Sequence, residues 1–187
     1  MEFYALPALM ADTAYDLGRN TQAVIAHYIN TAKENILKSG ELVPIAIFRS
    51  ETQEHIVHCG PMMKDEDTKE KLAVTLRKIA LETESIAFVF AAEAWTAKYD
   101  KDDLSVKKVM PSQRADRVEC IIVSAQYKGD KSSMRVAEII RDQNRKISHL
   151  LERDMYNGDD LTFEGRFAGV LDDESDDDRW SRMMENL

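Results

Sequence analysis

The chain has 187 residues, and its 34 acidic and 25 basic side chains give a formal charge of −9, which opposes passive attraction to nucleic-acid phosphates and anionic lipid. No basic segment precedes an apolar stretch at the start, and no apolar run approaches the roughly 18 residues of a membrane span, so secretion and membrane insertion are disfavoured. Cys59 and Cys120 each lie in an apolar run, where a free thiol usually behaves as a small buried hydrophobe, so we expect a reduced, cytoplasmic protein.

Apolar residues at helical spacing predict an amphipathic helix, or two, between residues 6 and 37. Gly18 is suited to end a first helix and Asn20 or Thr21 to cap a second, while Gly40 is expected to end the segment. The main apolar stripe consists of Met10, Leu17, Val24, Tyr28 and Ala32.

Two short apolar and β-branched runs follow, over residues 43–49 and 54–59, and the four residues between them fit the loop of an antiparallel hairpin. A second helix is predicted next, with Asp67 as its N-cap, Glu70 in a capping-box arrangement and an end near Glu84. One face of this helix carries Leu72, Leu76, Ile79 and Ala80.

Residues 86–97 and 118–127 are apolar at both parities, which is typical of strands covered on both faces in the middle of a sheet. Between them, residues 99–115 form a long polar loop. Residues 134–153 fit either a helix or a hairpin that turns at Asp142. We favour the hairpin, because a meander of strands needs only short connections.

The last apolar residues before the tail, Phe163, Phe167 and Leu171, are expected to dock on the core. The element order α-β-β-α-β-β-β-β predicts one α+β domain over residues 1–171, with a mainly antiparallel sheet of about five or six strands and two helices packed on it. This order resembles a roadblock or profilin-type α/β sandwich, a likeness of topology that implies no function.

Glu93 stands in an apolar central strand, where a carboxylate must be paired, hydrogen-bonded or placed at the edge of burial. Antiparallel pairing of the central strands would bring it to the same end of the sheet as Trp95, Arg117 and Glu119. These four residues are a candidate ligand-binding cluster, whose two carboxylates could serve as general acid and base if their surroundings split their pKa values. The structural interpretation is a partly buried Glu–Arg pair that anchors the sheet.

His55, His58 and Cys59 suggest zinc, because imidazole and thiolate are its usual ligands. Side chains alternate along a strand, so the two histidines face opposite sides, and no second Cys or His pair supplies further ligands. We therefore expect no metal. We also expect no cofactor, because the sequence lacks a Gly-rich phosphate loop, a Gly-x-Ser-x-Gly motif and a paired-Cys motif.

Three short motifs carry a resemblance to a known family. The run Ala92-Glu93-Ala94-Trp95, then Arg114-x-x-Arg117-x-Glu119 on the next apolar strand, then Ile139-Ile140-Arg141-Asp142, resembles a family of small uncharacterised bacterial and bacteriophage proteins. The resemblance spans residues 86–152. It implies no activity, cofactor or catalytic residue, but it does imply a phage or prophage accessory origin, and the host cytoplasm as the location if the protein is phage-encoded.

Residues 172–187 form an acidic tail that holds −5 of the formal charge of −9. The tail is too self-repelling and too poor in apolar residues to fold alone. Its large side chains have three- and four-residue spacing, so they could form one face of a short partner-binding helix, and the alternative is a plain solubilising tail. The candidate anchors are Trp180, Met183, Met184 and Leu187.

These patterns leave three hypotheses for function. The first is a non-enzymatic cytoplasmic accessory protein that acts by protein–protein contact, with the missing catalytic motifs as its main support. The second is a small enzyme or ligand binder built on the Glu/Arg/Trp cluster. The third is an acidic mimic of nucleic acid. The partner is expected to be a protein and not a nucleic acid or a membrane, and a homo-oligomer remains open.

Overall fold

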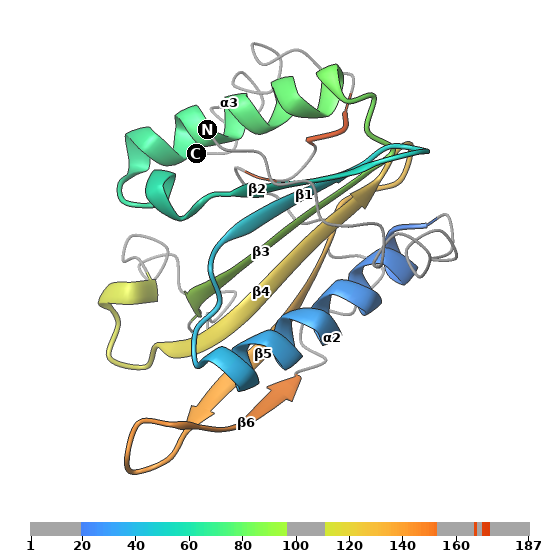
Figure 1. Ribbon diagram of the computed structural model, residues 1–187. Coiled ribbons are helices and arrows are strands. Elements are labelled where there is room, and N and C mark those ends of the chain that lie inside the picture. Colours follow the sequence, from blue (N-terminus) through green and yellow to red (C-terminus); the bar gives the residue numbers. More distant parts are fainter. Residues whose placement is uncertain (1–19, 97–110, 153–166, 168–169, 173–187) are drawn as a thin grey trace, which may run out of the picture.

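The computed structural model describes residues 20–96, 111–152, 167 and 170–172, and it contains one six-stranded antiparallel sheet with two helices packed on it (Figure 1). The α+β class and the order α-β-β-α-β-β-β-β are confirmed. Two short 3-10 helices, η2 (Gly60–Met62) and η4 (Pro111–Gln113), lie in the connections. The longer elements are α2 (Thr21–Ser39), β1 (Ile45–Arg49), β2 (Glu54–His58), α3 (Glu66–Glu82), β3 (Ala87–Thr96), β4 (Val118–Tyr127), β5 (Ser133–Arg141) and β6 (Ile147–Glu152).

The sheet has the strand order β2-β1-β3-β4-β5-β6, so the two strands that are apolar at both parities occupy its centre. Figure 1 shows α2 on one side of the sheet and α3 on the other. In β3, Val89 and Ala91 belong to the core under α2, whereas Phe88 and Phe90 belong to the core under α3. We call these two sides of the sheet the α2 face and the α3 face. Burial on both faces explains why the central strands lack alternation.

Helix α2 begins and ends where its local sequence favours a helix end. The side chain of Asn20 accepts a hydrogen bond of 2.8 Å from the amide of Ala23, which is N-cap geometry. Gly40 has a φ of +83° and closes the other end with its amide bonded to the carbonyl of Ile36. The earlier part of the predicted helical segment, with Met10 and Leu17, lies outside the described residues.

The predicted N-cap of α3 is wrong by two residues. Asp65, not Asp67, has the extended backbone of an N-cap, and its carboxylate accepts a 2.8 Å hydrogen bond from the amide of Thr68. The Thr68 hydroxyl in turn accepts a hydrogen bond from the backbone amide of Asp65, which completes a capping box. The helix then ends at Glu82, two residues before the expected end.

Both predicted hairpins are confirmed, and the alternative of a helix over residues 134–153 is wrong. Strands β1 and β2 pair from Arg49 opposite Glu54, and β5 and β6 pair on either side of a tight turn. In that turn the Asp142 carboxylate accepts hydrogen bonds from the amides of Asn144 and Lys146, at 2.8 and 2.9 Å. A polar residue that satisfies the turn amides in this way favours the hairpin over a helix.

A C-terminal segment covers part of the α3 face. The Phe167 ring stacks on Phe90 with centroids 4.3 Å apart, and Val170 is 3% exposed. The side chain of Gln126, itself 2% exposed, accepts a hydrogen bond of 3.0 Å from the amide of Leu171 and donates one to the Asp172 carboxylate. Docking of Phe167 and Leu171 is thus confirmed, and the first residue of the predicted tail is fastened to the sheet. Phe163, Trp180, Met183, Met184 and Leu187 lie outside the described residues.

The histidines and cysteines occupy structural positions. His58 is exposed and His55 is partly buried, and their neighbours Ile56 and Val57 belong to the cores on opposite faces, as the alternation predicts. Cys59 and Cys120 are buried free thiols, and burial raises the pKa of each to about 12. Within the described part of the chain no group of three or more His, Cys, Asp or Glu side chains is placed to hold a metal ion. No described helix is both long and apolar enough to cross a membrane.

Candidate functional site

The four candidate residues lie at one end of the sheet, where β3 ends and β4 begins. In the antiparallel register, Trp95 is directly opposite Glu119, and Glu93 is opposite Ile121. Ile121 belongs to the α2-face core, so Glu93, Trp95 and Glu119 are on the α2 face as well. Arg117 lies one residue before β4. The structure therefore brings together the residues that the sequence pattern grouped.

Trp95 and Arg117 form a stacked pair at the surface. Trp95 is 44% exposed, and the Arg117 guanidinium carbon lies 4.7 Å from the centroid of its ring. Arg117 also donates a hydrogen bond from Nη1 to the carbonyl of Ser112 in η4. A cation over an exposed indole contributes about 0.5–1 kcal/mol. The stacking and the Ser112 bond together fix the orientation of the guanidinium.

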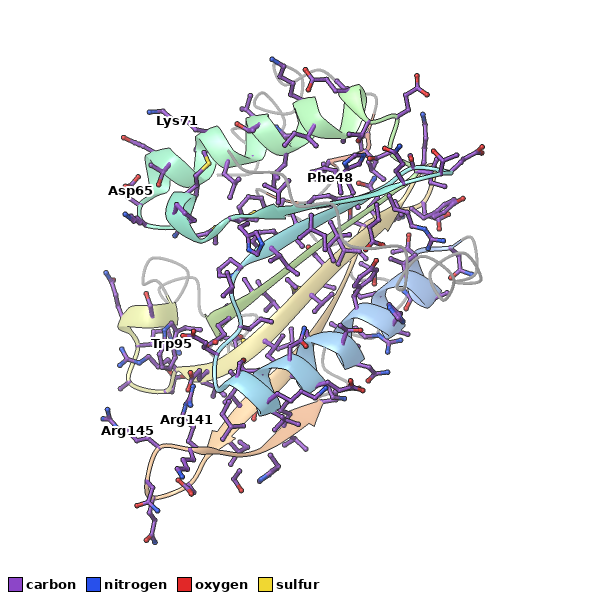
Figure 2. The ribbon with its side chains drawn as sticks, in the orientation of Figure 1. Phe48, Asp65, Lys71, Trp95, Arg141 and Arg145 are labelled. Carbon is purple, nitrogen blue, oxygen red and sulfur yellow. The ribbon has the colours of Figure 1, made fainter. Side chains whose placement is uncertain are left out.

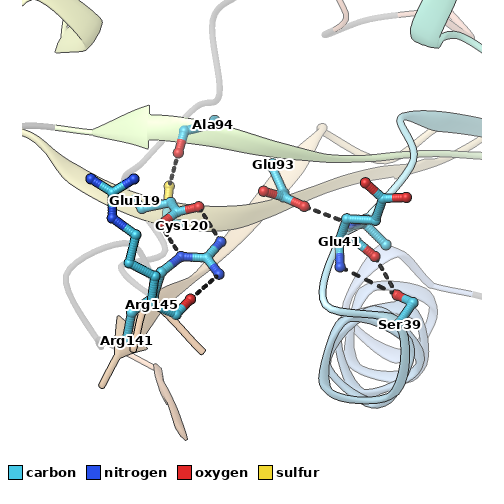
Figure 3. A network of polar contacts seen from close by, with 9 residues as sticks. Ser39, Glu41, Glu93, Ala94, Glu119, Cys120, Arg141 and Arg145 are labelled. Atoms are coloured by element: carbon cyan, nitrogen blue, oxygen red, sulfur yellow. Dashed lines mark hydrogen bonds and ion pairs between the residues drawn. The ribbon is translucent and has the colours of Figure 1, made fainter. Parts of the chain in front are cut away.

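Glu119 forms its ion pair with Arg141 of β5 and not with Arg117. The pair is bidentate, with Arg141 Nε 2.7 Å from one carboxylate oxygen and Nη2 bonded to the other (Figure 3). The hydrogen bonds from Arg141 hold the pKa of Glu119 below its ordinary value and raise the pKa of Arg141 itself. Arg141 also donates to the backbone carbonyl of Arg145 at 3.2 Å, which ties the pair to the β5–β6 turn.

Glu93 binds the backbone after α2 rather than an arginine. Its Oε1 accepts a hydrogen bond of 2.5 Å from the amide of Leu42, a residue that is only 8% exposed (Figure 3). The same stretch is braced by Ser39, whose hydroxyl contacts the backbone of Glu41. Glu93 therefore holds the segment between α2 and β1 against the end of β3.

The contact with Arg141 leaves Glu119 poorly suited to act as a general acid, because it favours the ionised carboxylate. Glu119 is held as an anion by Arg141, and Glu93 is engaged by a backbone amide. Catalytic acid and base need pKa values pushed apart, with one raised toward neutrality. The part of the cluster that faces solvent is Trp95 with Arg117, which we call the Trp95–Arg117 patch.

The sequence patterns missed Arg141 as a member of the cluster. It follows Ile139 in the run Ile139-Ile140-Arg141-Asp142, two positions farther along the α2 face of β5. A signal for it existed, because that run was one of the motifs of the family resemblance. The strand register that brings Arg141 to Glu119 could not be predicted, because residues 134–153 fitted both a helix and a hairpin.

Glu119→Gln is expected to lower the free energy of unfolding by about 1–2 kcal/mol at neutral pH, because it weakens a partly buried, charge-assisted pair. The folded-state pKa of Glu119 is depressed, so the stabilisation is complete above the unfolded-state pKa of about 4.3 and is lost as the pH falls through the folded-state pKa. Urea unfolding of both proteins from pH 7 to pH 3 measures this effect. A difference that stays constant below pH 4 would contradict the assignment.

No protein-family model, no curated protein and no solved structure matches the chain.

Proposed function

We propose that the protein is a binding module that acts by contact with another protein, and that the Trp95–Arg117 patch is the centre of that contact. The observation that supports this proposal is an indole left 44% exposed at the end of a central strand, with an oriented guanidinium stacked on it. Trp and Arg are the residues most enriched among those that dominate binding energy at protein interfaces.

The backbone around the patch is held in place by strand pairing and by side-chain contacts, which suits a binding surface. Trp95 is carried by β3, which pairs with β4 from Ala87 to Thr96. Beside it on the α2 face, the Glu119–Arg141 pair links β4 to β5, and the hydrogen bond that the Leu42 amide donates to Glu93 holds the segment after α2. Side chains that are already ordered lose less conformational entropy on binding, which leaves more of the contact energy for affinity.

The two other hypotheses have less support. A small enzyme or ligand binder would use Glu93 and Glu119 as its reactive groups, and both are engaged by internal partners. A nucleic-acid mimic would bind through an acidic face, whereas the exposed centre of the candidate site carries the cation of Arg117.

The proposal includes a cytoplasmic setting and a phage or prophage origin. The cytoplasmic setting is supported by two buried thiols that are not joined in a disulfide. The origin is supported by the three motifs of the family resemblance. Residues 172–187, with Trp180, Met183, Met184 and Leu187, are proposed as a second, tethered contact element.

Affinity capture tests the contact surface. Immobilised full-length protein is expected to retain at least one protein from a lysate of its source organism, and Trp95→Ala is expected to lose it. Leu151→Ala is the matched control, because Leu151 has the same exposed fraction of 44% but lies on the edge strand β6.

The captured protein is then identified, purified and titrated against the wild-type protein and the two variants. Binding that Trp95→Ala leaves unchanged, or that Leu151→Ala weakens equally, would contradict the proposed surface.

A further inference from the structure

Among the described residues, three acidic side chains near the Trp95–Arg117 patch are engaged by partners within the protein. Glu119 is paired with Arg141, and Glu93 accepts from the amide of Leu42. Asp116, which precedes Arg117, is paired with Arg114 at 2.8 Å. None of these carboxylates lies within ion-pair distance of Arg117, and no other carboxylate of the described residues does.

Arg117 keeps most of its donor capacity for an external group. A guanidinium has five N–H donors, and one bond from Nη1 of Arg117 goes to the carbonyl of Ser112. The stacking on Trp95 sets the plane of the group, and a fixed planar fork matches a carboxylate through two parallel hydrogen bonds. The internal pair of Arg141 with Glu119 shows this bidentate geometry in the same cluster.

The surroundings of the patch add positive charge. Arg145 and Lys146 are exposed in the β5–β6 turn, and Figure 2 shows Arg145 at the same end of the molecule as Trp95 and Arg141. The Asp142 carboxylate of that turn accepts hydrogen bonds from backbone amides and keeps its charge, so Arg145 and Lys146 against Asp142 leave the turn with a net charge of +1. The overall charge of −9 does not cancel this local excess, because −5 of it belongs to the tail and because salt screens exposed charges beyond about 8–10 Å.

We infer that the partner presents a carboxylate to this site: an acidic segment of another protein, with an Asp or Glu side chain bidentate to Arg117 and an adjoining apolar side chain against Trp95. This inference rests on the proposed function, which requires only that the patch be a contact surface. It adds the chemistry of the partner.

The chain has an acidic segment of its own, but the described start of that segment lies away from the patch. The tail starts at Asp172, which is bonded to Gln126 on the α3 face. Arg117 lies just before the first residue of β4, about 30 Å along the strand from Gln126. The patch is on the α2 face. A tail that reached the patch would have to pass around the sheet.

A fluorescence titration tests the inference. The protein has two tryptophans, so Trp180→Phe leaves Trp95 as the sole reporter. The probe is an acetylated, amidated Leu-Glu-Glu-Leu-Glu peptide, compared with Leu-Gln-Gln-Leu-Gln. The glutamate peptide is expected to give a saturable change in Trp95 emission, with at least about fivefold higher affinity than the glutamine peptide.

Variants in the same background separate contact from general charge. Arg117→Gln is expected to weaken binding of the glutamate peptide about fivefold or more, and Arg117→Lys to weaken it less. Lys128→Gln removes the same charge from the opposite end of β4 and is expected to leave the affinity within about twofold. Urea midpoints of all variants verify that each is folded.

Several outcomes would overturn the inference. These are equal affinity for the two peptides, no binding of either, or loss of affinity that Lys128→Gln reproduces. If capture still requires Trp95, the contact surface stands and only its proposed chemistry is wrong. Truncation after Asp172 is expected to leave peptide affinity unchanged, and a severalfold gain would identify the protein's own tail as the occupant.

Discussion

A chain truncated after Arg166 is expected to lose about 4–8 kcal/mol of folding free energy, whereas a chain truncated after Asp172 is expected to be as stable as the full-length protein. The shorter chain loses the ring stacked on Phe90 and the buried Val170. It also leaves the amide of Gln126, which is 2% exposed, without the partners it finds at Leu171 and Asp172. Because small domains are stable by only about 5–15 kcal/mol, a loss of this size would unfold much of the population.

Urea unfolding of both truncations measures this difference, and Lys128→Gln in the full-length chain is a control for a surface change. Equal midpoints for the two truncations would show that residues 167–172 contribute little to the core. If the chain truncated after Asp172 unfolds, part of residues 173–187 belongs to the core. If the chain truncated after Asp172 is stable but loses its captured partner, the tail is a recognition element. If that chain keeps its partner and only its solubility falls, the tail is a solubilising segment.

Glu93→Ala is expected to lower the free energy of unfolding by about 1–3 kcal/mol, because it leaves the amide of Leu42 buried without its acceptor. Glu93→Gln is the matched control, since an amide oxygen at the same position still accepts from Leu42. The glutamine variant is expected to lose less than half as much stability. Equal urea midpoints for Glu93→Ala and the wild-type chain would show that the Leu42 contact contributes nothing.

Most of the fold could be predicted because its elements are locally consistent. Strand β4 has the bounds expected from its apolar run, and Gly40 ends α2 where its left-handed backbone is needed. The cap of α3 shows the limit of local patterns. Two residue pairs fit a capping box, Asp65 with Thr68 and Asp67 with Glu70. The path of the backbone that enters the helix after η2 decides which aspartate becomes the N-cap.

The candidate site was predicted in part for the same reason. Glu93, Trp95 and Glu119 belong to two strands whose antiparallel pairing follows from their apolar pattern, so their meeting at one end needed no distant contact. Arg141 comes from the third strand of the meander, and its contact with Glu119 depends on the register of β5. The bond from Glu93 to the amide of Leu42 is a contact between distant segments that no local pattern encodes.

The most direct test of the Trp95–Arg117 patch as a contact surface is the indole N–H spectrum of the protein with its captured partner. Two tryptophans give two indole resonances, and Trp180→Phe assigns them. The proposed surface requires the Trp95 resonance to shift or broaden when the purified partner is added, and to remain unchanged when the added protein is not retained in the capture. A spectrum in which only the Trp180 resonance responds would contradict it and would place the contact in the tail.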